Sequence, residues 1–550
     1  MKTFLFFLFL LLSFKSAPVV FAAEEKIDVW KDEKYRLVVR EFSKEFATVL
    51  RQNININQQE INKSNKKEVR ECLNIENILD DKDNNSRYLC YLKNISEIVL
   101  NDDLLNQSEM NGREKYYTIV KNIRAALSTN FYMANKDSTD NQWISLIQNA
   151  SFILYSQINI RPFVNELTFK VSKYPKISLE KVKEEKDSKI NLLNYLEQVV
   201  VELTSVHKKI LEAPNEAKID RLGKIKQTLI GHLKDTNFDP ILQSNVPYQK
   251  LIYKYKNNKD KLCLHLGTPT IRNDESAEVN PEFKGFLKFL EKNNLKHTYV
   301  SFQSNIPASM FKWITRQGDE SYRAHCLEKL SADLEFRKTL TFAALDKDSD
   351  DFYWQKSGAF LDEYIYSKDF YKKFEERVFN SRNKGFFLSD AAVNHKDQMI
   401  SLIKSLMDSL YPKGKYLSRS ERKNFIELAY LLIMDNLSSD SYSLNFSCKD
   451  DIDRGTAAKA MLFLATFTKE ILDTQKRGED YDPKLFVEKT NHFISSIFAD
   501  ALMVRKREII DERLKRFQEV AIFFINQIKT NKQFKEFFIN NFNFTEVSAK

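Results

Sequence analysis

The sequence predicts a helix-rich α/β protein, and three observations lead to this prediction. Gly and Pro number only 11 each in 550 residues, which is low for an α/β enzyme and typical of a helical protein. Apolar residues recur at helical spacing near both ends of the chain, whereas its middle holds short apolar runs typical of strands. We therefore expect four segments: a signal peptide (1–22), an all-α region (23–243), an α/β domain (244–480) and a C-terminal helical extension (481–550).

The first segment resembles a secretory signal peptide. Met1 and Lys2 precede a short apolar run, and Val20-Phe21-Ala22 provides small or apolar residues before a cleavage point. The apolar run is shorter than the roughly 20 residues that a transmembrane helix needs. We expect an exported protein that is periplasmic, secreted or delivered into a host cell; an uncleaved N-terminal anchor is the alternative.

The region 23–243 shows helical periodicity in three stretches, 32–50, 113–127 and 190–203. These stretches contain no sequence motif that indicates a catalytic or ligand-binding site. We expect this region to serve as a binding or regulatory platform.

The α/β domain begins where the texture of the sequence changes. Residues 261–271 and 297–303 have the pattern of strands, and the apolar spacing of 283–292 between them predicts a helix. A strand–helix–strand order is typical of an α/β unit. We expect this unit to share one sheet with a later strand at 442–446, in which apolar and polar residues alternate.

The stretch after that later strand combines three features that favour anion chemistry. Cys448 follows the strand directly, Arg454 comes six residues later, and from Ala457 the composition favours a helix. A loop that leads into a helix N-terminus presents backbone N–H groups and the positive end of the helix dipole. A cysteine there is biased toward thiolate, and an arginine offers a planar fork for phosphate oxygens. The pattern predicts phosphate binding and nucleophilic attack.

The loop C-K-D-D-I-D-R resembles the signature of the cysteine-dependent phosphatases, in particular their phosphoinositide branch. Cys448 and Arg454 match that family's nucleophile and phosphate-binding arginine. Asp450 and Asp453 fall where myotubularin-like and Sac-type phosphatases carry paired acids. Lys449 falls where type II inositol polyphosphate 4-phosphatases and related secreted bacterial phosphatases carry a lysine. The resemblance implies a phosphatase-like α/β catalytic domain.

Two positions depart from the family pattern. The family usually has Ser or Thr directly after the arginine, whereas here Gly455 holds that place and Thr456 follows. The family's mid-loop glycine is replaced by Asp451, a residue type that tolerates left-handed backbone geometry. Three carboxylates then share one short loop. These departures keep an inactive, phosphate-binding relative among the alternatives.

The resemblance implies roles for the loop residues. Cys448 would attack phosphorus and Arg454 would bind the phosphate, while Asp453 or Asp450 would protonate the leaving alkoxide. Lys449, Gly455 and Thr456 would contact substrate. No cofactor is expected, and no zinc-ligand spacing, Walker loop or dinucleotide fingerprint is present in the sequence.

We expect an exported phosphatase that hydrolyses phosphomonoesters of phosphoinositides or inositol phosphates through a cysteinyl-phosphate. A protein tyrosine phosphatase, a non-catalytic phosphate-binding module and a helical protein with a coincidental loop are the alternatives. The net charge of +9 is compatible with acidic ligands and does not by itself indicate nucleic acid. A transient contact with a membrane surface is a further expectation, for which the basic cluster Arg505–Arg507 is the candidate.

Three other features have both a functional and a structural interpretation. The acidic segment 344–354 is interpreted as a solvated loop that Phe352, Tyr353 and Trp354 anchor. Cation binding by its acids, which lack the Gly and terminal Glu of a calcium loop, and delivery of a general acid are the alternatives. His265 is expected to be a buried core residue, and Arg272 an ordinary surface arginine that has a second phosphate as its alternative ligand.

The cysteine count of five is odd for an exported protein. Cys72 and Cys90 are close enough in sequence to form a bridge. A thiol left over is consistent with a free Cys448.

Overall fold

A computed structural model defines the fold. It describes residues 35–50, 84–100, 112–139, 141–157, 191–212, 246–247, 249–273, 276–303, 319–380, 385–498, 501 and 509–549. The predicted signal peptide, Cys72 and the basic cluster Arg505–Arg507 lie outside these residues. Within the described part of the chain, no helix combines the length and apolar character needed to cross a bilayer.

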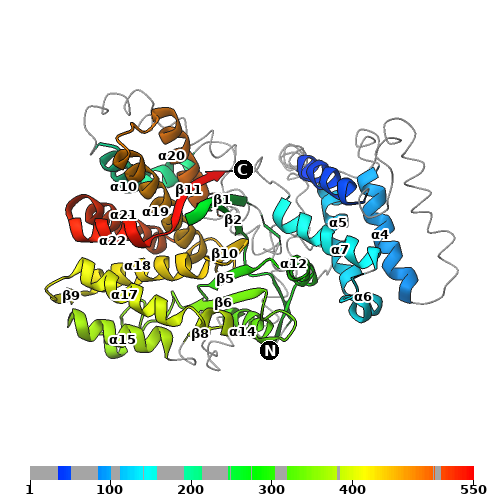
Figure 1. Ribbon diagram of the computed structural model, residues 1–550, viewed down its shortest axis with the longest axis horizontal. Coiled ribbons are helices and arrows are strands. Elements are labelled where there is room, and N and C mark those ends of the chain that lie inside the picture. The colour runs from blue at the N-terminus through cyan, green and yellow to red at the C-terminus, as the bar shows by residue number, and fades with distance from the viewer. Residues whose placement is uncertain are drawn as a thin grey trace, which may run out of the picture.

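The centre of the molecule is a mixed seven-stranded sheet (Figure 1) with the order β11-β1-β2-β10-β5-β6-β8. The strands are β1 (Gln249–Tyr255), β2 (Lys259–His265), β5 (His297–Ser301), β6 (Leu340–Leu345), β8 (Phe386–Leu388), β10 (Ser443–Ser447) and β11 (Phe544–Ala549). Strands β2, β10, β5 and β6 run parallel, and Leu444 of β10 pairs with Cys263 and Thr298. The loops that follow these four strands therefore meet at one edge of the sheet.

Side chains alternate between the two faces of the sheet, as the strand period requires. In β5, Tyr299 enters one apolar core and Val300 the other. In β6, Phe342 and Ala343 separate in the same way. Two apolar cores thus sandwich one sheet.

Two small antiparallel pairs accompany the main sheet. They are formed by β3 (Thr270–Asn273) with β4 (Ser276–Val279), and by β7 (Tyr364–Tyr366) with β9 (Tyr416–Ser418).

The first core lies under the helix of residues 35–50 and further helices from the N-terminal and middle parts of the chain. These are α4 (Asn84–Leu100), α5 (Gly112–Leu127), α6 (Asn130–Asn135), α7 (Gln142–Phe152) with its π-helical continuation (Ile153–Gln157), α12 (Pro281–Lys292) and α14 (Asp319–Ala332). α12 begins with Pro281 and turns Phe283, Phe286 and Leu290 inward. The Arg124 guanidinium of α5 pairs with the fully buried Glu282, which ties the N-terminal helices to α12.

The second core lies on the opposite face, under one helix from the first half of the chain and most helices of the second half. These are α10 (Asn191–Glu212), α15 (Ser367–Phe379), α16 (Asp390–Val393), α17 (Lys396–Leu410), α18 (Arg419–Leu437), α19 (Arg454–Lys476), α20 (Pro483–Phe498), α21 (Asp511–Thr530) and α22 (Lys532–Asn541). Figure 1 shows α10 beside α20 and α21, far from α4–α7. The hydroxyl of Thr204 donates to Gln518 of α21 at 2.7 Å. The predicted region 23–243 therefore contributes helices to both faces of the sheet.

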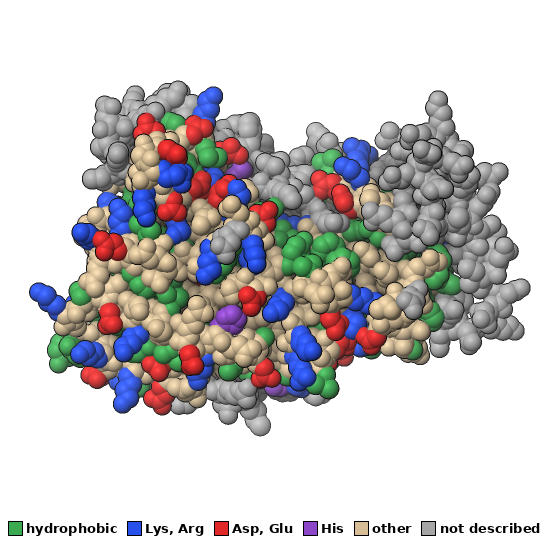
Figure 2. Space-filling model, viewed as in Figure 1, with side chains coloured by type: hydrophobic (Ala, Val, Ile, Leu, Met, Phe, Trp, Pro, Cys, Tyr) green, Lys and Arg blue, Asp and Glu red, His purple; other side chains and the backbone are tan. Residues whose placement is uncertain are grey.

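The helix-rich α/β class is confirmed, because helices dominate and a mixed sheet lies at the centre. The predicted strand–helix–strand unit is confirmed as β2, α12 and β5, and β10 lies in the same sheet. On the face shown in Figure 2, lysine and arginine side chains are interspersed with aspartate and glutamate. The C-terminal helices are confirmed as α20 and α21, but β11 was not predicted.

The end of α18 holds the start of β11 through one buried carboxylate. Asp435 accepts hydrogen bonds from the backbone N–H of Asn543 at 3.1 Å and from its side-chain amide at 2.7 Å. Burial raises the pKa of Asp435 to about 7, although the Asn543 hydrogen bonds oppose this rise. The folded chain therefore holds a proton here at a pH where the unfolded chain has lost it.

This raised pKa predicts a pH-dependent stability. Between about pH 4 and 7 the folded state binds the Asp435 proton more tightly than the unfolded state, so stability falls as pH rises and then levels off. The contribution is on the order of 4 kcal/mol at most. We expect Asp435→Asn to reduce the pH dependence of the denaturation midpoint over this window. Asp440→Asn, which changes an exposed carboxylate, should keep the pH dependence of wild type. Equal slopes for wild type and Asp435→Asn would contradict the assignment.

Candidate functional site

The candidate site is the loop between β10 and α19, and the ends of β2 and β5 hold its base. Ser447 donates its hydroxyl to the carbonyl of Leu266 at 2.6 Å, and its own carbonyl accepts from the N–H of Phe302 at 2.8 Å. The N–H of Thr268 donates to the carbonyl of Lys449 at 3.1 Å. Cys448 is therefore fixed at the carboxyl edge of the parallel strands, at the start of the loop that leads to α19.

Cys448 is a free thiol that is only 4% exposed. Its sulfur accepts a hydrogen bond from the backbone N–H of Gly455, in the first turn of α19. Burial raises the pKa of the thiol; the Arg454 guanidinium and the Gly455 N–H oppose this rise, and Asp451 and Asp453 add to it. The expected bias toward thiolate is wrong for this structure, because burial outweighs the positive charge.

Arg454 is the first residue of α19 and is turned toward the ends of β5 and β6. Its Nη1 donates to the carbonyl of Phe302 at 3.2 Å and lies 3.6 Å from a carboxylate oxygen of Asp348. The side chain is 9% exposed. A guanidinium held in this way is positioned beside the cysteine rather than in solvent.

The two departures from the phosphatase pattern fit each other in space. Asp451 adopts φ 60°, the left-handed conformation that a mid-loop glycine would supply. Its fully buried carboxylate pairs with Lys459 of α19 and packs against Gly455. A Cβ at Gly455 would lie 2.1 Å from that carboxylate and 2.9 Å from the Cα of Ser447. An aspartate at 451 therefore excludes Ser or Thr at 455.

The remaining loop residues have mixed placements. The Thr456 hydroxyl donates to the carbonyl of Asp451, so it stabilises the loop from a buried position. Asp453 accepts from the N–H of Ile510, the residue that precedes α21, at 3.1 Å. Lys449 and Asp450 are half-buried. The loop thus brings Asp453 and Asp451 near the sulfur, whereas the Thr456 hydroxyl is used in a hydrogen bond to the loop backbone.

The acidic segment after β6 comes close to this loop. Asp346 is fully buried, so its interpretation as part of a solvated loop is wrong; its carboxylate accepts from the N–H of Asp348 at 2.7 Å. Burial raises the pKa of Asp346 to about 6. The Asp348 side chain is 44% exposed and pairs with both Arg513 and Arg454. The strand order explains why the two loops are close, because only β5 lies between β6 and β10 in the sheet.

Other predictions have clear outcomes in the described residues. Phe352, Tyr353 and Trp354 are buried and anchor the acidic segment, as expected. His265 is buried at the end of β2, also as expected, and burial holds its pKa well below the ordinary value. Arg272 lies in β3, and its side chain is outside the described atoms. Cys90 is a free, exposed thiol on α4.

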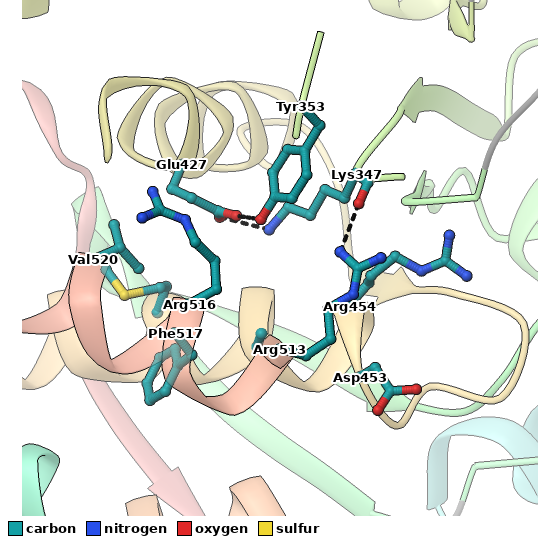
Figure 3. A pocket seen from close by; sticks show the side chains of 11 residues that line it. Lys347, Tyr353, Glu427, Asp453, Arg454, Arg513, Arg516, Phe517 and Val520 are labelled. Carbon is teal, nitrogen blue, oxygen red and sulfur yellow. Dashed lines mark hydrogen bonds and ion pairs between the residues drawn. The ribbon is translucent and has the colours of Figure 1, made fainter. Parts of the chain in front are cut away.

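A small pocket adjoins the start of α19 (Figure 3). Its charged lining residues are Lys347, Glu427, Asp453, Arg454, Arg513 and Arg516, and Tyr353 and α21 complete its wall. Cys448 is not among the lining residues. Within the described residues, no group of three or more His, Cys, Asp and Glu side chains is placed to hold a metal ion.

Sequence reasoning missed Lys459, Arg513 and Arg516. Lys459 gave a faint signal, because it interrupts an otherwise apolar A-A-K-A-M-L-F-L run. Arg513 and Arg516 lie about sixty residues beyond the loop, and only the packing of α21 on α19 brings them there. A single sequence contains no signal for such a contact.

Comparison with known proteins gives no match to a protein-family model, to a curated protein or to a solved structure.

The tight contact at Gly455 predicts a strong effect of one methyl group. Gly455→Ala would force Cβ against the Asp451 carboxylate and the backbone of Ser447 and Cys448. Overpacking of this kind costs about 1–3 kcal/mol. We expect that loss in chemical denaturation, with Ala457→Ser on the same helix as the control. A Gly455→Ala variant as stable as wild type would show that the loop differs from this geometry.

The buried thiol predicts slow alkylation. At pH 7 we expect iodoacetamide to modify Cys448 more slowly than the exposed Cys90, because burial hinders access and keeps the Cys448 thiol protonated. The Cys448 rate should rise as the pH approaches and passes 9. Peptide mass spectrometry of one sample measures both sites, with Cys90 as the internal control. Faster modification of Cys448 at pH 7 would contradict the assigned burial.

Proposed function

We propose that the chain is an exported phosphomonoesterase of the cysteine-dependent type, acting on phosphoinositides or inositol phosphates. One observation carries the proposal. The sulfur of Cys448 accepts a backbone N–H at the start of α19 while Arg454 folds back beside it at the edge of the parallel strands. A nucleophile, a helix N-terminus and a guanidinium fork are the components that phosphoryl transfer uses.

The proposed reaction has two steps. The Cys448 thiolate attacks phosphorus, forming an S–P bond as the P–O bond to the leaving alkoxide breaks, and the alkoxide takes a proton from a carboxylic acid. Water then attacks the cysteinyl-phosphate, which releases inorganic phosphate and regenerates the thiolate. Because the thiol is held protonated by burial, the first step is expected to accelerate with rising pH.

The choice of general acid involves three carboxylates. Asp450 and Asp453 remain the candidates that the resemblance implies, but Asp453 already accepts from Ile510. The structure adds Asp348, which is partly exposed and lies 3.6 Å from Arg454. Asp346 is less suited to proton transfer, since it is fully buried and braces the backbone of Asp348.

The substrate class rests on the resemblance and on charge. Lys449 lies in the loop where the inositol phosphatases carry a lysine, and the net charge of +9 is compatible with acidic ligands. Export rests on the signal-peptide pattern of residues 1–22, and delivery into a host cell would place the thiol in a reducing compartment. Contact with a membrane surface through the 505–507 cluster is part of the same proposal.

A second candidate function is a non-catalytic module that binds phosphorylated ligands. The burial of Cys448 and the engagement of Arg454 by Asp348 favour this alternative. A protein tyrosine phosphatase is the alternative substrate class, and the choice of substrates in the assay distinguishes it.

Phosphate release under reducing conditions tests the proposal. We expect wild type to release phosphate from soluble inositol phosphates faster than from phosphotyrosine, with a rate that increases between pH 7 and 9. Cys448→Ser should abolish release, because the hydroxyl is a poor nucleophile here. The general acid is identified by comparing Asp348→Asn, Asp453→Asn and Asp450→Asn over pH. Its variant should lose the most activity on substrates with poor leaving groups and the least on substrates with good ones, which need no proton.

The matched control is Asp440→Asn, an exposed carboxylate elsewhere on the chain. If wild type binds inositol phosphates but releases no phosphate at any pH, the module replaces the enzyme as the function. Equal release by wild type and Cys448→Ser would remove Cys448 from the chemistry.

A further inference from the structure

The ribbon formed by β7 and β9 presents tyrosines to solvent. Its register pairs Tyr366 with Tyr416, whose ring centroids lie 5.5 Å apart, and the strand period places Tyr364 on the same face. Tyr364 is 57% exposed and Tyr416 is 68% exposed. Ile365 and Leu417 point the other way, into the second core. The ribbon is therefore packed on one face, while its aromatic face is largely open to solvent.

This aromatic face lies at one end of the molecule. Figure 1 shows β9 at the margin farthest from α4–α7. Leu361, three residues before Tyr364, is half-exposed and adds apolar surface next to the ribbon. Tyrosine combines a large apolar ring with a polar hydroxyl, and such residues are enriched in the centres of protein–protein interfaces. The face therefore has the composition of a contact surface for another protein.

A fully buried arginine of α18 holds the ribbon in shape. The Nη2 of Arg422 donates to the carbonyl of Asp362 at 2.6 Å. Its Nη1 donates to the carbonyls of Leu417 at 2.7 Å and Glu363 at 3.1 Å. These bonds tie the segment before β7 to β9 from beneath. A surface that is ordered in this way before it binds loses less conformational entropy on association.

One end of the ribbon is acidic. Because β7 and β9 are antiparallel, the start of β7 lies beside the end of β9. The exposed Asp362 and Glu363 directly precede β7 at this end. Arg419, which follows β9, lies there too and donates to the carbonyl of Leu361 at 2.9 Å. Two carboxylates and one guanidinium give this end a formal charge of −1.

The other end of the ribbon is basic. The N–H of Ser367 donates to the carbonyl of Lys415 at 2.8 Å, so the end of β7 lies beside the turn that precedes β9. That turn carries the exposed Lys413, and the exposed Lys368 begins α15 next to it. Lys415 is neutralised by Glu421. With Asp369, the neighbour of Lys368, two lysines and one carboxylate then give this end a formal charge of +1.

A face with an aromatic centre and oppositely charged ends is complementary to itself. A two-fold axis through the tyrosines lays one copy on another with the ribbon reversed, so the acidic end of each copy meets the basic end of its partner. The tyrosines then form the centre of the contact and the charges form its rim. An anionic surface such as a lipid bilayer would attract one end and repel the other, so a second copy fits this face better.

We propose that the β7–β9 ribbon is the interface of a two-fold homodimer. Tyr364, Tyr366 and Tyr416 of the two copies pack together, and Asp362 and Glu363 of each copy face the lysines at the basic end of the other. The dimer goes beyond the proposed phosphatase chemistry and does not depend on it.

Analytical ultracentrifugation of the full chain, from about 1 to 100 µM, tests the dimer. We expect a monomer–dimer equilibrium for wild type. The double variant Tyr364→Ser, Tyr416→Ser should raise the dimer Kd by about tenfold or more, because it removes the aromatic centre of the contact. Leu334→Ser, at a side chain that is 77% exposed between α14 and β6, should leave the Kd unchanged. A wild type that is monomeric at every concentration overturns the proposal.

A charge exchange between two variants tests the proposed orientation. One variant carries Asp362→Lys and Glu363→Lys, and the other carries Lys413→Glu and Lys368→Glu. Each variant alone should dimerise more weakly than wild type, since like charges then face each other across the two-fold axis. An equimolar mixture should form heterodimers, because both contacts between the two variants are attractive. Variants that dimerise as wild type does, or a mixture that stays monomeric, would overturn the proposed interface.

Two further measurements keep the result unambiguous. The substituted side chains are exposed or partly exposed, and circular dichroism confirms that each variant folds; if the tyrosine variant does not fold, the charge exchange decides alone, since a folding defect cannot produce heterodimers. Flotation with phosphatidylserine-containing vesicles tests the other occupant. A monomeric wild type that binds these vesicles, and loses binding in the tyrosine variant, would assign the face to a lipid surface and overturn the dimer.

Discussion

The buried ion pair between Asp451 and Lys459 is the interaction on which the geometry of the site depends. Asp451 occupies the left-handed turn of the loop, and its carboxylate lies beneath the first turn of α19, where Lys459 neutralises it. A buried carboxylate without a cation is strongly unfavourable, so the pair fixes both the loop and the helix above it. Gly455 is then the residue that fits, because any Cβ would enter the space that the carboxylate and the strand end occupy.

The same packing brings charge from distant segments to one edge of the sheet. Four parallel strands end there, so the segment after β6 places Asp348 beside Arg454. Helix α21 crosses the start of α19 and adds Arg513 to the same carboxylate. Asp348 thereby links the loop that carries Cys448 to α21. The candidate acid Asp348 thus belongs to one ion-pair network with Arg454 and Arg513.

Features that local interactions determine were predicted correctly from the sequence, whereas features that depend on contacts between distant residues were not. The strand before Cys448, the helix after its loop and the β2–α12–β5 unit could be predicted, since local periodicity determines them. β11 was not readable, because a lone edge strand depends on its partner β1 and on Asp435, about a hundred residues away. The thiolate prediction failed for a related reason: the helix dipole and Arg454 are local, whereas the burial that outweighs them is tertiary.

The sequence by itself determined the helix-rich α/β class, the order of the elements around Cys448 and the chemistry that its loop resembles. These properties rest on residues within about one or two turns of each other in the chain. Only the tertiary structure decided the pairing of Asp451 with Lys459, the approach of Asp348, and the placement of Arg513 and Arg516. The physical reason is that burial and ion pairing depend on which surfaces meet in space, and spacing along the chain does not encode that.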